Sequence, residues 1–179
     1  EGDYTMSHLW KIAVPAEIPA DVKARPKPEA ITEGRQFSVQ SFEWSPDGKQ
    51  IAFSATRDPD LASQDTLQVY VVDLSDKHVR KLSDGSGPNG SPVWSPDGRQ
   101  IAFSTANGEK FFYYSNSRIA IVPLEGGKAR VITAEFDEDP RLHAWTAKGI
   151  YFSALQKTAL QLFRLDPTTA KYKVVTTPK

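Results

Sequence analysis

The fold is decided by a sequence that occurs twice, WSPDGKQIAFS at residues 44–54 and WSPDGRQIAFS at residues 94–104. The copies start fifty residues apart, and ten of their eleven positions are identical. A degenerate third copy, WTAKGIYFSA, covers residues 145–154 and is two residues shorter in its turn. Self-similarity at a fixed period of this length indicates a repeat architecture.

Each copy predicts the same local structure. In Ser-Pro-Asp-Gly, proline presets φ for the first turn position and glycine accepts the left-handed conformation that joins two strands. The following Ile-Ala-Phe-Ser segment has strand character. Apolar third strands and more polar fourth strands follow, the third at residues 69–74, 118–124 and 160–166, the fourth at residues 79–83, 129–133 and 172–176.

A four-stranded unit of roughly fifty residues has the spacing of a propeller blade. The third strands show little polar alternation, which is typical of strands covered on both faces, as in stacked blades. The sequence therefore predicts an all-β chain, a partial β-propeller of four-stranded antiparallel blades. The alternative is a β-sandwich with two similar hairpins, which the near-identity at fixed spacing disfavours.

The predicted blade boundaries leave the first unit incomplete. Residues 1–37 form the end of one blade, with strands expected at 7–14 and 29–33, and complete blades follow at 38–87, 88–138 and 139–179. This gives about three and a half blades, whereas closed propellers have about four to eight. Further blades of a longer parent chain close the ring, or the open stack exposes apolar faces and edges that favour self-association.

Composition excludes several function classes. The 179 residues carry 22 basic and 22 acidic side chains, without the basic excess of nucleic-acid or membrane-surface binders. No cysteine is present, which excludes disulfides and thiolate metal sites. The sequence has no apolar run long enough for a membrane span, and its three histidines lack metal-ligand spacing. No cofactor and no metal are expected.

The repeat resembles that of TolB-like proteins and of prolyl oligopeptidase-family serine peptidases. Other segments resemble the N-terminal propeller of bacterial dipeptidyl aminopeptidase and acylaminoacyl peptidase-like enzymes. These are Ser7-His8-Leu9-Trp10, Pro28-Glu29-Ala30-Ile31-Thr32, the insertion at residues 57–66, and the segments 113–118 and 136–140.

The resemblance implies a division of labour. In the peptidase family the propeller covers the active site, filters peptide substrates by size and, in dipeptidyl peptidases, helps to hold their N-terminus. A C-terminal α/β-hydrolase domain supplies the Ser-Asp-His triad. This chain has no Gly-x-Ser-x-Gly elbow, so it is not expected to catalyse alone. The alternative is a TolB-like, non-enzymatic protein-binding propeller. Both families imply a periplasmic or secreted location.

Two segments contain candidate substrate-binding residues. Glu135, Asp137 and Glu138, with Asp139, form an acidic run suited to a peptide ammonium group; a solvated loop is the alternative. Tyr113, Tyr114 and Arg118 combine aromatic faces with hydrogen-bond donors that suit a peptide backbone or carboxylate; ordinary packing is the alternative. The repeated tryptophans, Trp10, Trp44, Trp94 and Trp145, are predicted to lie in the core.

Overall fold

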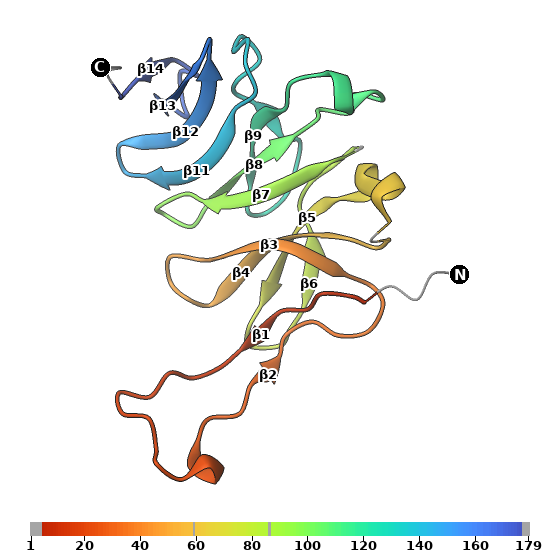
Figure 1. Ribbon diagram of the computed structural model, residues 1–179, viewed down its shortest axis with the longest axis vertical. Coiled ribbons are helices and arrows are strands. Elements are labelled where there is room, and N and C mark those ends of the chain that lie inside the picture. The colour runs from red at the N-terminus through yellow and green to blue at the C-terminus, as the bar shows by residue number, and fades with distance from the viewer. Residues whose placement is uncertain (1–4, 59, 86, 177–179) are drawn as a thin grey trace.

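A computed structural model describes residues 5–58, 60–85 and 87–176. Within these residues the strands form three four-stranded antiparallel sheets and one two-stranded sheet. Figure 1 shows the sheets stacked one after another along the long axis, from β1 and β2 at the bottom to β11–β14 at the top. This arrangement confirms the prediction of an all-β partial propeller.

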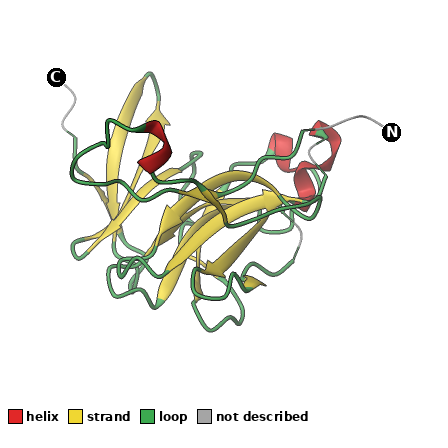
Figure 2. Cartoon of the chain, turned by 90° about the horizontal axis from the view of Figure 1, so that it is seen from below, coloured by secondary structure: helices red, strands yellow, loops and turns green. Residues whose placement is uncertain are grey.

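Consecutive strands are neighbours in every sheet. The two-stranded sheet contains β1 (Trp10–Lys11) and β2 (Glu29–Ala30). The others contain β3 (Ser38–Trp44), β4 (Gln50–Thr56), β5 (Gln68–Asp73) and β6 (Val79–Lys81); β7 (Asn89–Trp94), β8 (Gln100–Thr105), β9 (Arg118–Pro123) and β10 (Arg130–Val131); and β11 (Arg141–Thr146), β12 (Gly149–Gln156), β13 (Ala159–Leu165) and β14 (Tyr172–Val174). Three short 3-10 helices, η1 (Val22–Ala24), η2 (Leu61–Thr66) and η3 (Phe112–Tyr114), lie in connecting loops outside the sheets (Figure 2).

The Ser-Pro-Asp-Gly turns are held by their own side chains. Ser45 Oγ donates to Asp47 Oδ1 at 2.7 Å and accepts from Gln50 N at 2.9 Å. Hydrogen bonds from the Ser45 hydroxyl and the Lys49 N–H hold the pKa of Asp47 below its ordinary value. Gly48 has φ of 70°, where a side chain would be strained. The second copy, at residues 95–100, repeats the same contacts.

Where the outermost strand of each sheet ends, a serine or threonine hydroxyl accepts the next backbone N–H of the neighbouring strand. The Ile119 N–H donates to Thr133 Oγ1 at 2.7 Å, and Ile132 N donates to the Ile119 carbonyl. The same pair of bonds recurs in the other sheets, where the hydroxyls belong to Thr32, Ser83 and Thr176. Because the hydroxyl accepts the N–H that would otherwise bond to the next backbone carbonyl, the outer strands stay short.

Three buried clusters lie between successive sheets, since residues alternate between the two faces of a strand. Phe53 faces the cluster with β1–β2, while Ala52 faces the next sheet. The last cluster joins β7–β10 to β11–β14 and is centred on Phe136, Phe152 and Phe163, whose ring centroids are 5.0 to 5.2 Å apart. The core is therefore shared between blades.

The tryptophan prediction is correct for Trp94, which is buried, and Trp145 also packs partly against a core cluster. It is wrong for Trp10 and Trp44, which are 61% and 45% exposed. Trp44 pairs with Ile51, so it lies on the face turned toward the first sheet. Within the described residues that sheet contains only β1 and β2, so no inner strand of it covers Trp44.

Candidate functional site

The loop between β8 and β9 presents aromatic side chains to solvent. Tyr114 is 92% exposed and Tyr113 is also exposed. The rings of Phe112 and Tyr113 lie 4.0 Å apart, and Lys110 lies over the ring of Phe111. The two predicted tyrosines are thus exposed and do not fill the core.

Hydrogen bonds tie the aromatic loop to the acidic run. The Asn116 amide donates to the Asp137 carbonyl at 2.9 Å. Asp139 Oδ1 accepts from both the backbone N–H and the hydroxyl of Ser117, at 2.9 and 2.5 Å. Arg118 donates to the carbonyls of Asn116 and Ser117, at 3.3 and 3.0 Å, and so braces its own loop. The two predicted segments are therefore neighbours on one rim.

The three predicted carboxylates differ in their surroundings. Glu138 is half-buried and lines a groove of about 630 Å³ beside Arg141 and Leu160. Asp137 is exposed and contacts the aromatic loop through its carbonyl. Glu135 is exposed, and nowhere in the described chain does a hydrogen bond join it to that loop. Among the described residues, a hydrogen bond thus links Asp137, and a shared groove links Glu138, to Asn116 of the aromatic loop.

A second cavity on the same rim was not predicted. It has a volume of about 420 Å³ and lies between the sheet of β7–β10 and the strand β11. The first strands of successive sheets contact one another, which places this cleft on the inner side of the stack. Its lining is Ser91, Ser104, Ser117, Asp139, Pro140, Arg141, Leu142 and His143. We call it the inner cleft.

β-bulges shape the inner cleft. An extra residue interrupts the register of β7 between Gly90 and Val93, and that of β11 between Leu142 and Ala144. Ser91 lies in the first bulge with φ of 51°, a left-handed conformation that is uncommon for a residue other than glycine. A bulge bends its strand and redirects a side chain, so Ser91 and His143 reach the cleft from two different blades.

Ser104 differs from the equivalent serines of the other two repeats, because its hydroxyl has no hydrogen-bond partner within the described residues. Ser54 Oγ lies 2.7 Å from Ser41 Oγ, and Ser153 Oγ lies 2.7 Å from His143 Nε2. Ser91 stands three residues before its tryptophan, as Ser41 does, but its φ directs it elsewhere. Within the described residues Ser104 Oγ has no hydrogen-bond partner and lines the inner cleft.

Arg141 supplies the positive charge of the cleft. Its side chain is exposed at the start of β11, and across the described residues it forms no salt bridge within 4.0 Å, even with Asp139. The Asp139 carboxylate is engaged by Ser117 through one oxygen. A cation, serine hydroxyls and an anionic acceptor thus line the same cleft.

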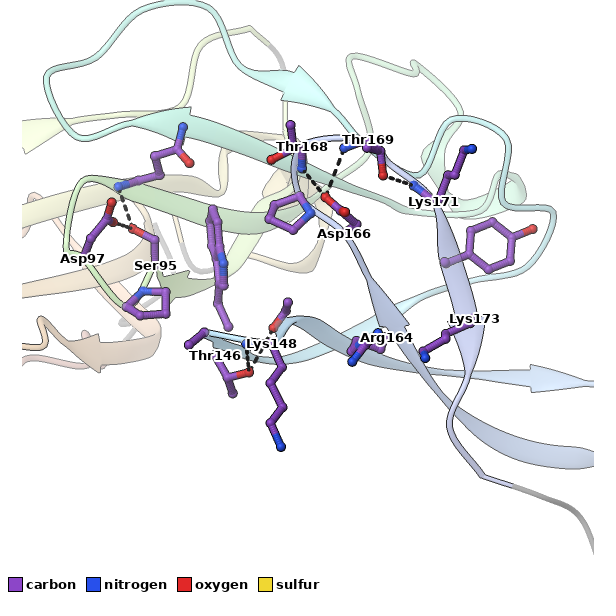
Figure 3. Close-up of a pocket in the computed structure, with 17 residues that line it drawn as sticks. Ser95, Asp97, Thr146, Lys148, Arg164, Asp166, Thr168, Thr169, Lys171 and Lys173 are labelled. Atoms are coloured by element: carbon purple, nitrogen blue, oxygen red, sulfur yellow. Dashed lines mark hydrogen bonds between the residues drawn. The ribbon is translucent and has the colours of Figure 1, made fainter.

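The opposite rim contains a cavity of about 780 Å³ between the hairpin turns (Figure 3). Lys148, Arg164, Lys171 and Lys173 surround it. Asp166 lies there too, but its Oδ1 accepts from Thr168 N at 2.8 Å and Thr169 N at 3.1 Å, which lowers its pKa. One oxygen of its carboxylate thus maintains the turn.

The described residues contain no group of three or more histidine, aspartate or glutamate side chains placed to hold a metal ion. Nor does any described helix combine the length and apolar character needed to cross a bilayer.

The stacked four-stranded antiparallel sheets define the chain as part of a β-propeller. Residues 26–179 match the TolB beta propeller domain family (PD40), and the chain belongs to that family. TolB from Acinetobacter baumannii superposes with a TM-score of 0.66 at 23% identity, over 84% of this chain and 35% of that one.

Peptidases are also among the similar proteins. Dipeptidyl-peptidase 5 of Porphyromonas gingivalis is 28% identical over 152 residues, which make up 77% of this chain and 21% of that protein. The acylaminoacyl peptidase of Pyrococcus horikoshii has a TM-score of 0.61 at 16% identity, over 90% of this chain and 24% of that one. The chain thus spans about a fifth of its curated relative. These findings confirm the resemblance to TolB-like repeats and to peptidase propellers.

Proposed function

We propose that this chain is a propeller segment of a serine-type peptidase of the dipeptidyl or acylaminoacyl peptidase kind. There it admits and orients peptide substrates for an α/β-hydrolase domain elsewhere in the parent protein. The observation that carries the proposal is the 28% identity to dipeptidyl-peptidase 5 over 152 residues. The absence of a nucleophile elbow from this chain agrees with such a division of labour.

The chemistry of the aromatic rim supports an orienting role. Exposed rings at Tyr113 and Tyr114 offer flat apolar surface at a low entropic cost on binding. Asp137 and Glu138 lie near Asn116 of the same loop, and carboxylates favour a peptide ammonium group through charge-assisted hydrogen bonds. A peptide held by such contacts enters in one direction, which raises the effective concentration of its reactive bond at a catalytic serine.

Labelling tests the enzymatic part of the proposal. The intact gene product is expected to react with a fluorophosphonate probe at one serine outside residues 1–179. Absence of labelling would contradict the peptidase assignment and leave the TolB-like alternative, a propeller that binds proteins without catalysis.

Kinetics test the orienting part. Replacing Tyr113 and Tyr114 together by alanine is expected to lower kcat/KM for peptide substrates about tenfold, because the loss of two ring contacts costs roughly 1–2 kcal/mol. Ile18→Ala, which removes an exposed apolar side chain from the loop between β1 and β2, is the control and should leave kcat/KM unchanged. Equal kinetics for both variants would exclude the aromatic rim from substrate binding.

A further inference from the structure

The inner cleft carries chemistry that the acidic run does not. Arg141 is a cation without an ion-pair partner within the described residues, and Ser104 is a hydroxyl without a hydrogen-bond partner there. Both line the same cavity of about 420 Å³. Because the two belong to different blades, only the stacking of β7–β10 on β11–β14 brings them together.

We propose that the inner cleft binds the carboxylate of a peptide ligand, with Arg141 as the anion-binding residue. A guanidinium presents parallel N–H donors that match the two oxygens of a carboxylate. The hydroxyls of Ser91 and Ser104 line the cleft beside it and provide neutral donors to the same group.

The strained bulge is part of this site. A non-glycine residue with φ near 51° costs free energy, and such conformations cluster at ligand sites. In β3 the equivalent serine, Ser41, is bonded to Ser54. In β7 the conformation of Ser91 separates it from Ser104 and leaves two serine hydroxyls for a ligand.

Asp139 favours an α-carboxylate over an acidic side chain. Ser117 engages only one of its oxygens, so the other remains to accept a hydrogen bond. The last residue of a peptide carries an amide N–H close to its carboxylate, and this pair of groups matches an acceptor beside a cation. A glutamate side chain holds its carboxylate farther from the backbone N–H. The ligand is thus a peptide C-terminus.

This inference rests on the proposed function, since it names a second peptide contact on the same rim. Arg141 lines both the inner cleft and the groove that Glu138 lines, so the cation and an acidic side chain belong to the same part of the rim.

The test is calorimetric titration of the intact gene product after treatment with the fluorophosphonate, so that no peptide is cleaved. The ligands are N-acetyl-Gly-Ala-Ala with a free C-terminus, the same peptide as its amide, and N-acetyl-Ala-Glu-Ala amide. We expect the peptide with the free C-terminus to bind at least about tenfold more tightly than its amide, because it gains a charged hydrogen-bonded pair. Arg141→Gln is expected to remove this difference, and Ser104→Ala to reduce it a few-fold.

Arg99→Gln is the matched control, because Arg99 is an exposed arginine on the opposite rim, in the turn of residues 95–100. It should retain the full preference. Equal affinity for acid and amide, no binding of either, or a preference that survives Arg141→Gln would overturn the carboxylate site. Tight binding of the glutamate peptide would overturn the assignment to a C-terminus. Serine labelling is read separately, so failure of the peptidase proposal remains distinguishable.

Discussion

At the scale of single residues, Glu43 links two blades by a partly desolvated carboxylate. Its Oε2 accepts from the Trp94 N–H at 2.7 Å, and the Trp94 indole donates to the Glu43 carbonyl at 3.2 Å. Burial raises the pKa of Glu43, against the opposing effect of the Trp94 N–H. The side chain thus accepts the Trp94 N–H, but its charged form is disfavoured because it is partly removed from water.

Replacing Glu43 separates these two effects. Glu43→Gln keeps an oxygen acceptor and is expected to change the free energy of unfolding little, whereas Glu43→Ala leaves the Trp94 N–H unpaired and costs about 1–2 kcal/mol. The folded pKa lies above the unfolded one, so the native state binds more protons between them and stability falls as pH rises through that window. Urea unfolding should therefore show that the stability of Glu43→Gln relative to the unchanged chain is higher at neutral pH than at about pH 4. A difference that does not change with pH would contradict the raised pKa.

At the scale of strands, the hydrogen bond from a backbone N–H to an outer serine or threonine hydroxyl recurs in every sheet. Thr133→Val is expected to destabilise the chain by about 1–3 kcal/mol, because it leaves the buried Ile119 N–H without a hydrogen-bond acceptor. Thr176→Val removes the equivalent bond from Leu162 N at an exposed position, where water replaces the hydroxyl, so its cost should be much smaller. Urea unfolding of both variants measures the contrast, with Thr133→Ser as a control that keeps the hydroxyl. Equal costs would mean that burial of the bond is unimportant.

The same strands show what could be predicted from sequence. Near-identical turns predicted the blades because proline, aspartate and glycine each have a fixed part in the turn. The outer hydroxyls were missed, although an apolar residue followed by serine or threonine recurs at Ile31-Thr32, Leu82-Ser83, Ile132-Thr133 and Val175-Thr176. That dipeptide was a usable signal. The predicted strands at 7–14 and 29–33 are longer than β1 and β2, because the Thr32 hydroxyl takes the Leu9 N–H.

The inner cleft could not have been predicted in this way. Ser91 and His143 are fifty-two positions apart, and a one-residue bulge leaves no mark in the pattern of a strand. The tyrosines and carboxylates were predictable as residue types that bind peptides, whereas their juxtaposition depends on how Asn116 and Ser117 join two loops. Local propensity thus predicted elements, and contacts between elements decided the site.

At the scale of the whole molecule, contacts between blades follow one scheme at the outer strands. Arg80 donates to the Leu124 carbonyl of the next sheet, and Arg130 donates to the Pro167 carbonyl at 2.6 Å. By strand register Lys173 is the next member of this series, and it lies on the outer face of the last sheet. That face therefore presents a basic side chain at the position from which Arg80 and Arg130 contact the next sheet.

That face is also apolar, which leads to a prediction for the 179-residue chain alone. Leu155 and Leu160 are direct cross-strand partners, 57% and 71% exposed, on the side of β12 and β13 opposite the core. Exposed apolar sheet faces associate in water, so the sedimentation coefficient of the isolated chain should rise with concentration. Leu160→Lys is expected to shift it toward the monomer value, whereas Thr158→Lys, which adds the same charge at an exposed turn between these strands, should not. If the isolated chain stays monomeric at every concentration, this face does not drive its association.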